Sequence, residues 1–301
     1  MWEAKDALWG CISPLKILMN SVRVVNSNKL VFCSILCFTT LPLSFLTFTH
    51  TLSTHTLRSH IYHLEAVARV ASTRVEASHV WHESRNDAVS LLRTRALFAL
   101  LCFPLSLAAA VSSVHVAVSA VQGKASSISS AVRDHWKRPA VTAIFVYVIL
   151  LAFAAVPHVL AIPFVSPWSR ILVRTLGWGV EVYLMAVLSL GLVVSVVEER
   201  FGWDAIRVGS CLMQGRRFCG WFLSALFVSV SGLINWKVQV LMENQNSVIG
   251  VWDKTVFMCS YALVVLLSYV INAVFYCDSK RRLGIKEVDE QDDCVSDSSS
   301  L

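Results

Sequence analysis

Residues 139–169 decide the fold, and they read PAVTAIFVYVILLAFAAVPHVLAIPFVSPWS. This stretch holds no Asp, Glu, Lys or Arg, and it is the longest uncharged run in the chain. A helix needs about 20 apolar residues to cross a hydrocarbon core about 30 Å thick. A lone strand in lipid would leave its backbone N–H and C=O groups without partners. The stretch therefore predicts a transmembrane helix.

Five further stretches share this character, and only one of them carries a charge, at Glu181. The six runs predict transmembrane helices near residues 31–50, 97–121, 140–162, 175–197, 218–236 and 255–277. The composition agrees, because 55% of the residues are hydrophobic and 15% are charged. In a soluble domain about 45–50% of the residues are apolar and about 25% are charged. The sequence thus predicts an all-α polytopic membrane protein and argues against a soluble enzyme.

The basic residues flank the apolar runs, so the net charge of +6 does not indicate a nucleic-acid partner. The N-terminal segment, the second and fourth connections and the tail hold four Lys or Arg each, and the third and fifth connections hold two each. By the positive-inside rule both termini are expected in the cytosol, although six Arg in the first connection count against this orientation. The expected location is an endomembrane or the plasma membrane. The expected partners are the lipid bilayer and other membrane proteins.

The segments outside the apolar runs predict additional, amphipathic helices at the membrane interface. Residues 1–29 show apolar residues at helical spacing, with a helix start at Ser13-Pro14, and are expected to lie either on the cytosolic leaflet or against the helix bundle itself. Within the transmembrane domain, residues 30–279, the connection 53–95 predicts a long amphipathic helix, a turn at residues 84–87 and a second helix. The acidic, serine-rich tail, residues 280–301, predicts disorder.

The connection 53–95 also carries two histidine pairs, His60 with His63 and His79 with His82. His63 and His79 are sixteen residues apart, about 24 Å along a continuous helix. A single zinc site built from both pairs is therefore not expected. The chain has no catalytic, phosphate-binding or dinucleotide-binding motif. We expect no metal, no cofactor, no catalytic residue and no known small-molecule ligand.

Two groups of residues are candidates for function. The first is the ionisable groups inside the apolar runs, which are functional candidates because a bilayer disfavours them; they are Glu181, His115 and His158. The second is a cytosolic motif in the fourth connection: Glu198, Gly202, Trp203, Asp204 and Arg207. Here we expect a short helix with an apolar stripe formed by Phe201, Ala205, Val208 and Leu212, and an ion pair between Asp204 and Arg207.

Two stretches carry a resemblance to a known family. Residues 10–46 read GCISPLKILMNSVRVVNSNKLVFCSILCFTTLPLSFL, and residues 195–217 read SVVEERFGWDAIRVGSCLMQGRR. Together they resemble a family of uncharacterised plant multi-pass membrane proteins. The spacing of Glu198, Gly202, Ala205 and, one position late, Ser210 is also similar to that in a broader set of helical integral-membrane domains. The resemblance implies six helices and an unknown activity, and it supplies no catalytic residue.

Three functional hypotheses follow. The first is a non-enzymatic protein with a structural, scaffolding or membrane-organising role. The second is a carrier or channel for a small solute, which requires Glu181, His115 and His158 to converge on one water-accessible cavity. The third is a membrane-embedded enzyme, which requires a nucleophile and a base within hydrogen-bonding distance.

Overall fold

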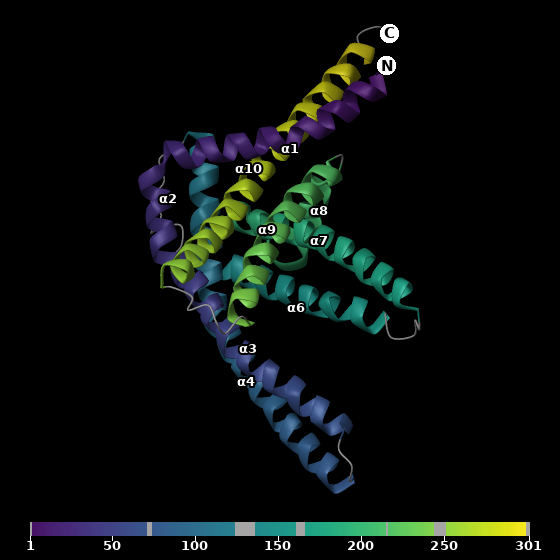
Figure 1. Ribbon diagram of the computed structural model, residues 1–301. Coiled ribbons are helices and arrows are strands. Elements are labelled where there is room, and N and C mark those ends of the chain that lie inside the picture. Colours follow the sequence, from purple (N-terminus) through teal and green to yellow (C-terminus); the bar gives the residue numbers. More distant parts are fainter. Residues whose placement is uncertain are drawn as a thin grey trace. The chain divides into compact units, whose positions relative to one another are not determined.

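The computed structural model describes residues 2–70, 74–123, 136–160, 166–214, 216–243 and 251–298, and within these ranges its regular elements are all helices (Figure 1). In chain order they are α1 (Trp2–Ser27), α2 (Lys29–Ile35), the π-helix η1 (Leu36–Thr40), α3 (Leu41–Val70), α4 (Arg74–Gln122), α6 (Lys137–Leu160), α7 (Pro167–Val197), α8 (Gly202–Leu212), α9 (Arg217–Glu243) and α10 (Val251–Ser298).

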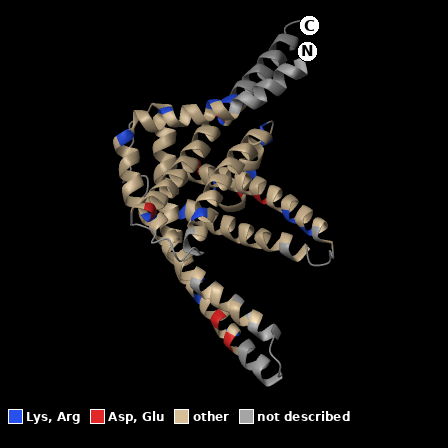
Figure 2. Ribbon diagram, in the orientation of Figure 1, with Lys and Arg blue, Asp and Glu red and all other residues tan. Residues whose placement is uncertain are grey.

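Six helical stretches are long and apolar enough to cross a membrane. They are Lys29–Ile61, His82–Gln122, Lys137–Pro157, Trp168–Val197, Arg217–Val240 and Trp252–Leu283. Figure 2 shows that long parts of these helices carry neither acidic nor basic side chains. The six helices predicted from the sequence are thereby confirmed as helices, although all but the third are longer than expected.

The chain forms two compact units. The first comprises Met1–Ser34, Ala110–Gly232 and Val264–Leu301, and the second comprises Ile35–Ala109 and Leu233–Leu263. The helices α4, α9 and α10 contribute to both units. The buried side chains of the first unit come chiefly from the second halves of α4 and α7, from the middle of α10 and from α8 and the residue after it; among the largest are Tyr276, Phe275, Leu188, Leu190, Met213, Leu266 and Ile271.

Pro42 accounts for the irregular turn before α3. Proline has no N–H, and its ring clashes with the carbonyl group four residues earlier in a regular helix. The chain widens at this point into η1, where the Leu41 N–H donates to the Leu36 carbonyl oxygen, five residues back. The hydroxyl groups of Thr39 and Thr40 donate to the carbonyl oxygens of Ile35 and Leu36, at 2.7 and 3.1 Å. The altered backbone therefore gains side-chain donors inside an apolar stretch.

The helices α3 and α4 run antiparallel within the second unit. His60 Nδ1 lies 2.8 Å from Asp87 Oδ2, and the rings of His50 and Phe98 lie 5.2 Å apart. The chain reverses between Val70 and Arg74, so the turn predicted at residues 84–87 is wrong. α4 passes through residues 84–87 without a break. Polar residues therefore need not end a helix whose side chains water can solvate.

This reversal also removes the continuous helix assumed between His63 and His79. Of the four histidines, His60 bonds Asp87, while His63 and His82 are exposed. The side chain of His79 lies outside the described residues. Among the described residues, no group of three or more His, Cys, Asp or Glu is placed to hold a metal ion.

The two ends of the chain contain more helix than the sequence predicts. α1 begins at Trp2 and contains Pro14, whereas a helix start was expected at Ser13-Pro14. The residues before Pro14 include Ala, Leu, Lys and Glu, which are good helix formers. α10 continues to Ser298 through the tail expected to be disordered. No proline interrupts residues 251–298, so the backbone can remain helical there.

Close backbone packing selects the buried face of α8. A Cβ atom on Gly209 would lie 2.7 Å from the backbone nitrogen of Gly191 in α7. The buried residues of α8 are Gly202, Ala205, Ile206, Gly209 and Leu212. The predicted stripe is therefore wrong in part, because Phe201 is exposed and Val208 is only partly buried. Two of the buried positions are glycines, which a hydrophobicity pattern does not detect.

Candidate functional site

The chain turns sharply where α7 gives way to α8. α7 ends at Val197, the last residue of its apolar run, and three charged residues follow. Gly202 then adopts φ +62°, a left-handed conformation that favours glycine. Its buried N–H donates to Thr142 Oγ1 of α6 at 2.9 Å. This bond joins residues 60 positions apart and fixes the start of α8 against α6.

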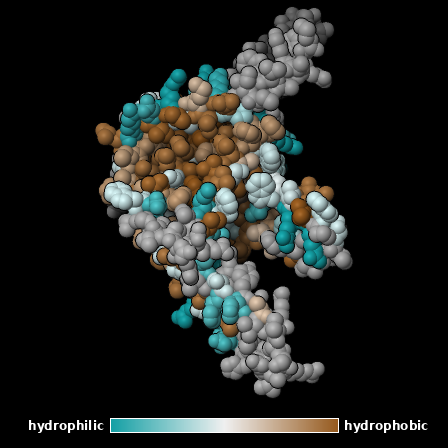
Figure 3. Space-filling view, viewed as in Figure 1, coloured by the Kyte–Doolittle hydropathy of each residue, from teal (hydrophilic) through white to brown (hydrophobic). Residues whose placement is uncertain are grey.

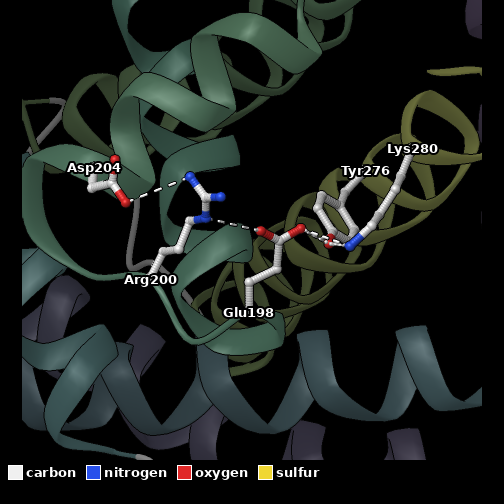
Figure 4. Close-up of polar contacts among 5 residues, drawn as sticks. All are labelled: Glu198, Arg200, Asp204, Tyr276 and Lys280. Carbon is white, nitrogen blue, oxygen red and sulfur yellow. Dashed lines mark hydrogen bonds and ion pairs between the residues drawn. The ribbon is translucent and has the colours of Figure 1, made fainter. Parts of the chain in front are cut away.

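Glu198 lies at the centre of a polar network at this turn (Figure 4). Its Oε1 accepts hydrogen bonds from the Tyr276 hydroxyl group at 2.6 Å and from Lys280 Nζ at 2.8 Å. Lys280 Nζ also lies 3.1 Å from the Tyr276 hydroxyl oxygen. Tyr276 and Lys280 are four residues apart on α10, so their side chains share one face of that helix. The carboxylate therefore connects the end of α7 to α10.

The environment of Glu198 favours its charged form. Burial on its own raises the pKa of the Glu198 carboxyl group, and this is the largest single effect. The hydrogen bonds from Lys280 and Tyr276, together with the positive charges of Lys280 and Arg200, act in the opposite direction. Their sum outweighs burial, and the pKa of Glu198 lies below its ordinary value of 4.5. Glu198 is therefore ionised at neutral pH.

Arg200 extends the network into α8. Its Nε lies 3.9 Å from Glu198 Oε2, and one of its terminal nitrogens lies 3.6 Å from Asp204 Oδ2. The sequence predicted that Asp204 pairs with Arg207 across one helical turn, and this prediction is wrong. Asp204 pairs instead with Arg200, four residues earlier, while Arg207 is exposed.

Three further ion pairs lie at the same end of the unit, and two of them join neighbouring elements. Arg216, just before α9, bonds Asp278 of α10, and its guanidinium group lies 5.5 Å from the centre of the Phe275 ring. Arg282 also approaches Asp278, at 3.6 Å. Arg138 of α6 lies 3.6 Å from Glu199. We call these residues, with the network around Glu198, the charged cluster: Arg138, Glu198, Glu199, Arg200, Asp204, Arg216, Tyr276, Asp278, Lys280 and Arg282.

The charged cluster gathers the start of α6, the end of α7, the start of α9 and the later part of α10. In the sequence these four places alternate between the beginnings and the ends of apolar runs. Their contacts therefore require that successive runs from α6 to α10 pass back and forth, as a polytopic bundle does. The described acidic groups of the cluster all have cationic partners, so the arrangement is suited to holding helices together.

The remaining motif residues have different environments. Gly202 is buried, as its backbone hydrogen bond requires. Trp203 is 65% exposed and contributes nothing to the buried face of α8. The sequence analysis missed Thr142, Tyr276 and Lys280. Tyr276 and Lys280 could have been found from their spacing of four residues at the end of an apolar run.

The three ionisable residues proposed within the membrane lie on three different helices. Glu181 lies in α7 and is partly buried, and His115 lies in α4 and is also partly buried. Within the described residues no hydrogen bond or ion pair connects these two side chains. His158 belongs to α6, but its side chain lies outside the described residues.

Comparison with known proteins identifies a family but no individual relative. Neither the curated proteins nor the solved structures include a match to this chain. One family model, described as "Domain of unknown function (DUF8558)", matches residues 9–293. The matched range includes the six apolar helices and the whole charged cluster. The chain therefore belongs to this family, whose conserved unit extends over nearly its entire length.

Proposed function

We propose that this protein is a multi-pass integral membrane protein with a non-enzymatic, scaffolding or membrane-organising role. The observation that carries the proposal is the apolar surface left outside the packed core. In α6, only 17% of the most apolar stretch is buried. Its exposed side chains include Ile144, Phe145, Val148, Leu151 and Val159. Hydrophobic residues also make up most of the described surface on the face that Figure 3 shows.

A hydrocarbon solvent accounts for this surface better than water does. Soluble monomers rarely expose contiguous apolar patches above a few hundred Å². A helix that exposes apolar residues along most of its length is stable when lipid surrounds it. The resemblance of residues 10–46 and 195–217 to plant multi-pass membrane proteins supports the same conclusion.

The charged cluster supports a scaffolding role over catalysis. Each described carboxylate of the cluster forms an ion pair with a basic side chain. None of these carboxylates is therefore left to act as a general base beside a nucleophile. The carrier hypothesis requires polar groups that converge on one pathway, and among the described residues no hydrogen bond or ion pair joins Glu181 to His115. We place the charged cluster on the cytosolic side, where the positive-inside rule puts the segments rich in Lys and Arg.

Insertion and orientation can be tested on the full chain. After membranes are washed with alkaline carbonate, the protein should remain in the pellet. In a variant whose only cysteine is Cys211, which is exposed on α8, an impermeant maleimide should react from the cytosolic side. In a matched variant whose only cysteine is Ser247→Cys, the reagent should react from the opposite side. Extraction by carbonate, or labelling of both positions from one side, would contradict the proposal.

The scaffolding role can be tested in sealed vesicles. Vesicles that contain the reconstituted protein should retain protons, small ions and small neutral solutes as well as protein-free vesicles do. A flux that appears with the protein and disappears in a Glu181→Gln variant would instead support the carrier or channel hypothesis.

A further inference from the structure

The basic residues around the charged cluster are of two kinds. At two places two basic residues are adjacent in the sequence and only one of them has a carboxylate partner among the described residues, and at a third place the middle one of three consecutive basic residues has none. Arg138 pairs with Glu199, whereas Lys137 beside it is exposed. Arg216 pairs with Asp278, whereas Arg217 is exposed.

The third place lies on α10. Lys280 and Arg282 pair with Glu198 and Asp278, whereas Arg281 between them is exposed. Arg207 on α8 is a fourth exposed cation. Among the described residues none of these four cations has an acidic partner. They come from four different elements at the same end of the first unit.

The charge balance at this end is strongly positive. The described residues there include nine Lys or Arg, namely Lys137, Arg138, Arg200, Arg207, Arg216, Arg217, Lys280, Arg281 and Arg282. The acidic residues are four, Glu198, Glu199, Asp204 and Asp278. The side chains named here therefore carry a surplus of five positive charges, which favours an anionic partner.

A second observation indicates where that anionic partner lies. Three of the four exposed cations have an exposed aromatic residue close by in the sequence. Trp136, which precedes Lys137, is 49% exposed, and Phe218, which follows Arg217, is 60% exposed. Trp203, one helical turn before Arg207, is 65% exposed. Aromatic rings and basic side chains together are characteristic of the headgroup region of a bilayer.

We infer that Lys137, Arg207, Arg217 and Arg281 form a binding surface for anionic phospholipid headgroups, such as phosphatidylserine, while their paired neighbours stabilise the fold. The inference rests on the proposed membrane insertion. Anionic lipids are concentrated in the cytosolic leaflet, and each basic residue near that surface adds to the attraction. A paired arginine such as Arg216 is 13% exposed and already neutralised, so it is not available to a lipid.

The test compares two spin-labelled lipids around the reconstituted full chain. In vesicles of phosphatidylcholine with a minor fraction of phosphatidylserine, the protein should immobilise labelled phosphatidylserine roughly five-fold more strongly than labelled phosphatidylcholine. High salt should reduce this preference, because salt screens exposed charges. The variant with Lys137→Gln, Arg207→Gln, Arg217→Gln and Arg281→Gln should lose most of it.

A matched variant controls for the loss of charge. Arg170→Gln, Arg174→Gln, Lys237→Gln and Lys254→Gln remove the same number of charges from the third and fifth connections and the helix ends beside them. This variant should keep the preference for phosphatidylserine. Equal loss in both variants, or equal immobilisation of both lipids by the native chain, would overturn the inference.

The outcomes also separate this inference from the proposed function. If the native chain immobilises neither lipid, the membrane insertion itself is refuted. If it immobilises phosphatidylcholine but shows no preference, only the headgroup surface is refuted. Helical circular dichroism and a single gel-filtration peak must be retained by both variants. We expect this because the substituted cations of the surface have no carboxylate partner among the described residues.

Discussion

At the scale of single residues, the carboxylate of Glu198 illustrates how charge is accommodated beside an apolar run. The group is only 20% exposed, yet both its oxygens face cations or a hydroxyl donor. The sequence predicted that Glu198 belongs to a functional motif but not what it contacts. Its donors Tyr276 and Lys280 are 78 and 82 residues away in the sequence. Contacts between residues this far apart leave no local sequence pattern from which they could be predicted.

The stability of the protein should decrease in acid because of Glu198. Since the folded state holds the pKa of Glu198 below its ordinary value of 4.5, the carboxylate contributes stability above that pH. This contribution is lost as the pH falls through the lower, folded value. In detergent, Glu198→Gln should lower the free energy of unfolding by about 1 kcal/mol at neutral pH, because Lys280 is half-exposed and partly screened.

The pH dependence provides the sharper readout for that variant. Thermal unfolding of Glu198→Gln should depend less on pH, in the acid range, than that of the native protein. Glu199→Gln is the control, since Glu199 is 90% exposed and should leave both the stability and its pH dependence nearly unchanged. A steeper acid transition in Glu198→Gln than in the native protein would contradict the assignment.

Thr142 provides a second prediction at this scale. The Thr142 side chain is fully buried, and its hydroxyl oxygen accepts from the Gly202 N–H. Thr142→Val preserves the shape but leaves this buried donor without its partner, so it should destabilise the fold by about 1–3 kcal/mol. Thr142→Ser keeps the hydroxyl group and should cost less. Denaturant unfolding of the two variants measures which one is less stable. If Thr142→Val were as stable as Thr142→Ser, the hydrogen bond to the Gly202 N–H would be dispensable.

At the scale of elements, the apolar runs could be predicted from the sequence and the turns could not. Each of the six runs is uncharged or nearly so, and hydrocarbon permits only helix there. The cluster at residues 84–87 indicated a turn, but its polar side chains are compatible with a helix that water solvates. The face of α8 was misassigned because Gly202 and Gly209 are buried by close backbone contact.

The contact between α7 and α8 should be sensitive to one added methyl group. Gly209→Ala places a Cβ atom 2.7 Å from the backbone nitrogen of Gly191, which cannot move without shifting the helix. We expect a loss of about 1–3 kcal/mol in the free energy of unfolding. Gly232→Ala in α9 meets no atom within 4 Å, so it should be neutral or stabilise by up to about 1 kcal/mol. Thermal unfolding in detergent measures the stability of both variants. A Gly209→Ala variant as stable as the native protein would exclude the close contact.

At the scale of the whole molecule, the proposed membrane insertion relates the length of the apolar helices to the thickness of the bilayer. Arg217 and Lys237 bound the apolar part of α9 and are twenty residues apart, about 30 Å along a helix. Lys237 also lies 5.3 Å from the centre of the Trp236 ring, as basic and aromatic groups do at an interface. This separation equals the hydrocarbon thickness of a typical bilayer.

Stability should therefore depend on the thickness of the bilayer. In phosphatidylcholine bilayers of different acyl length, the unfolding temperature should be highest near a hydrocarbon thickness of about 30 Å and lower on either side. Each ångström of mismatch should cost a fraction of a kcal/mol. A series of vesicles with thinner, matching and thicker bilayers measures this, and a constant unfolding temperature would contradict it.

The long sequence separation between Glu198 and Lys280 has a consequence for biosynthesis. The ribosome completes α7 and Glu198 before it adds the 82 residues that lead to Lys280, a delay of roughly 4–16 s at ordinary elongation rates. Until then a nascent chain presents the Glu198 carboxylate without its phenol and ammonium donors. Because α10 is translated last, it completes the network around Glu198. A transcript truncated before Tyr276 encodes a protein in which Glu198 lacks both of these donors.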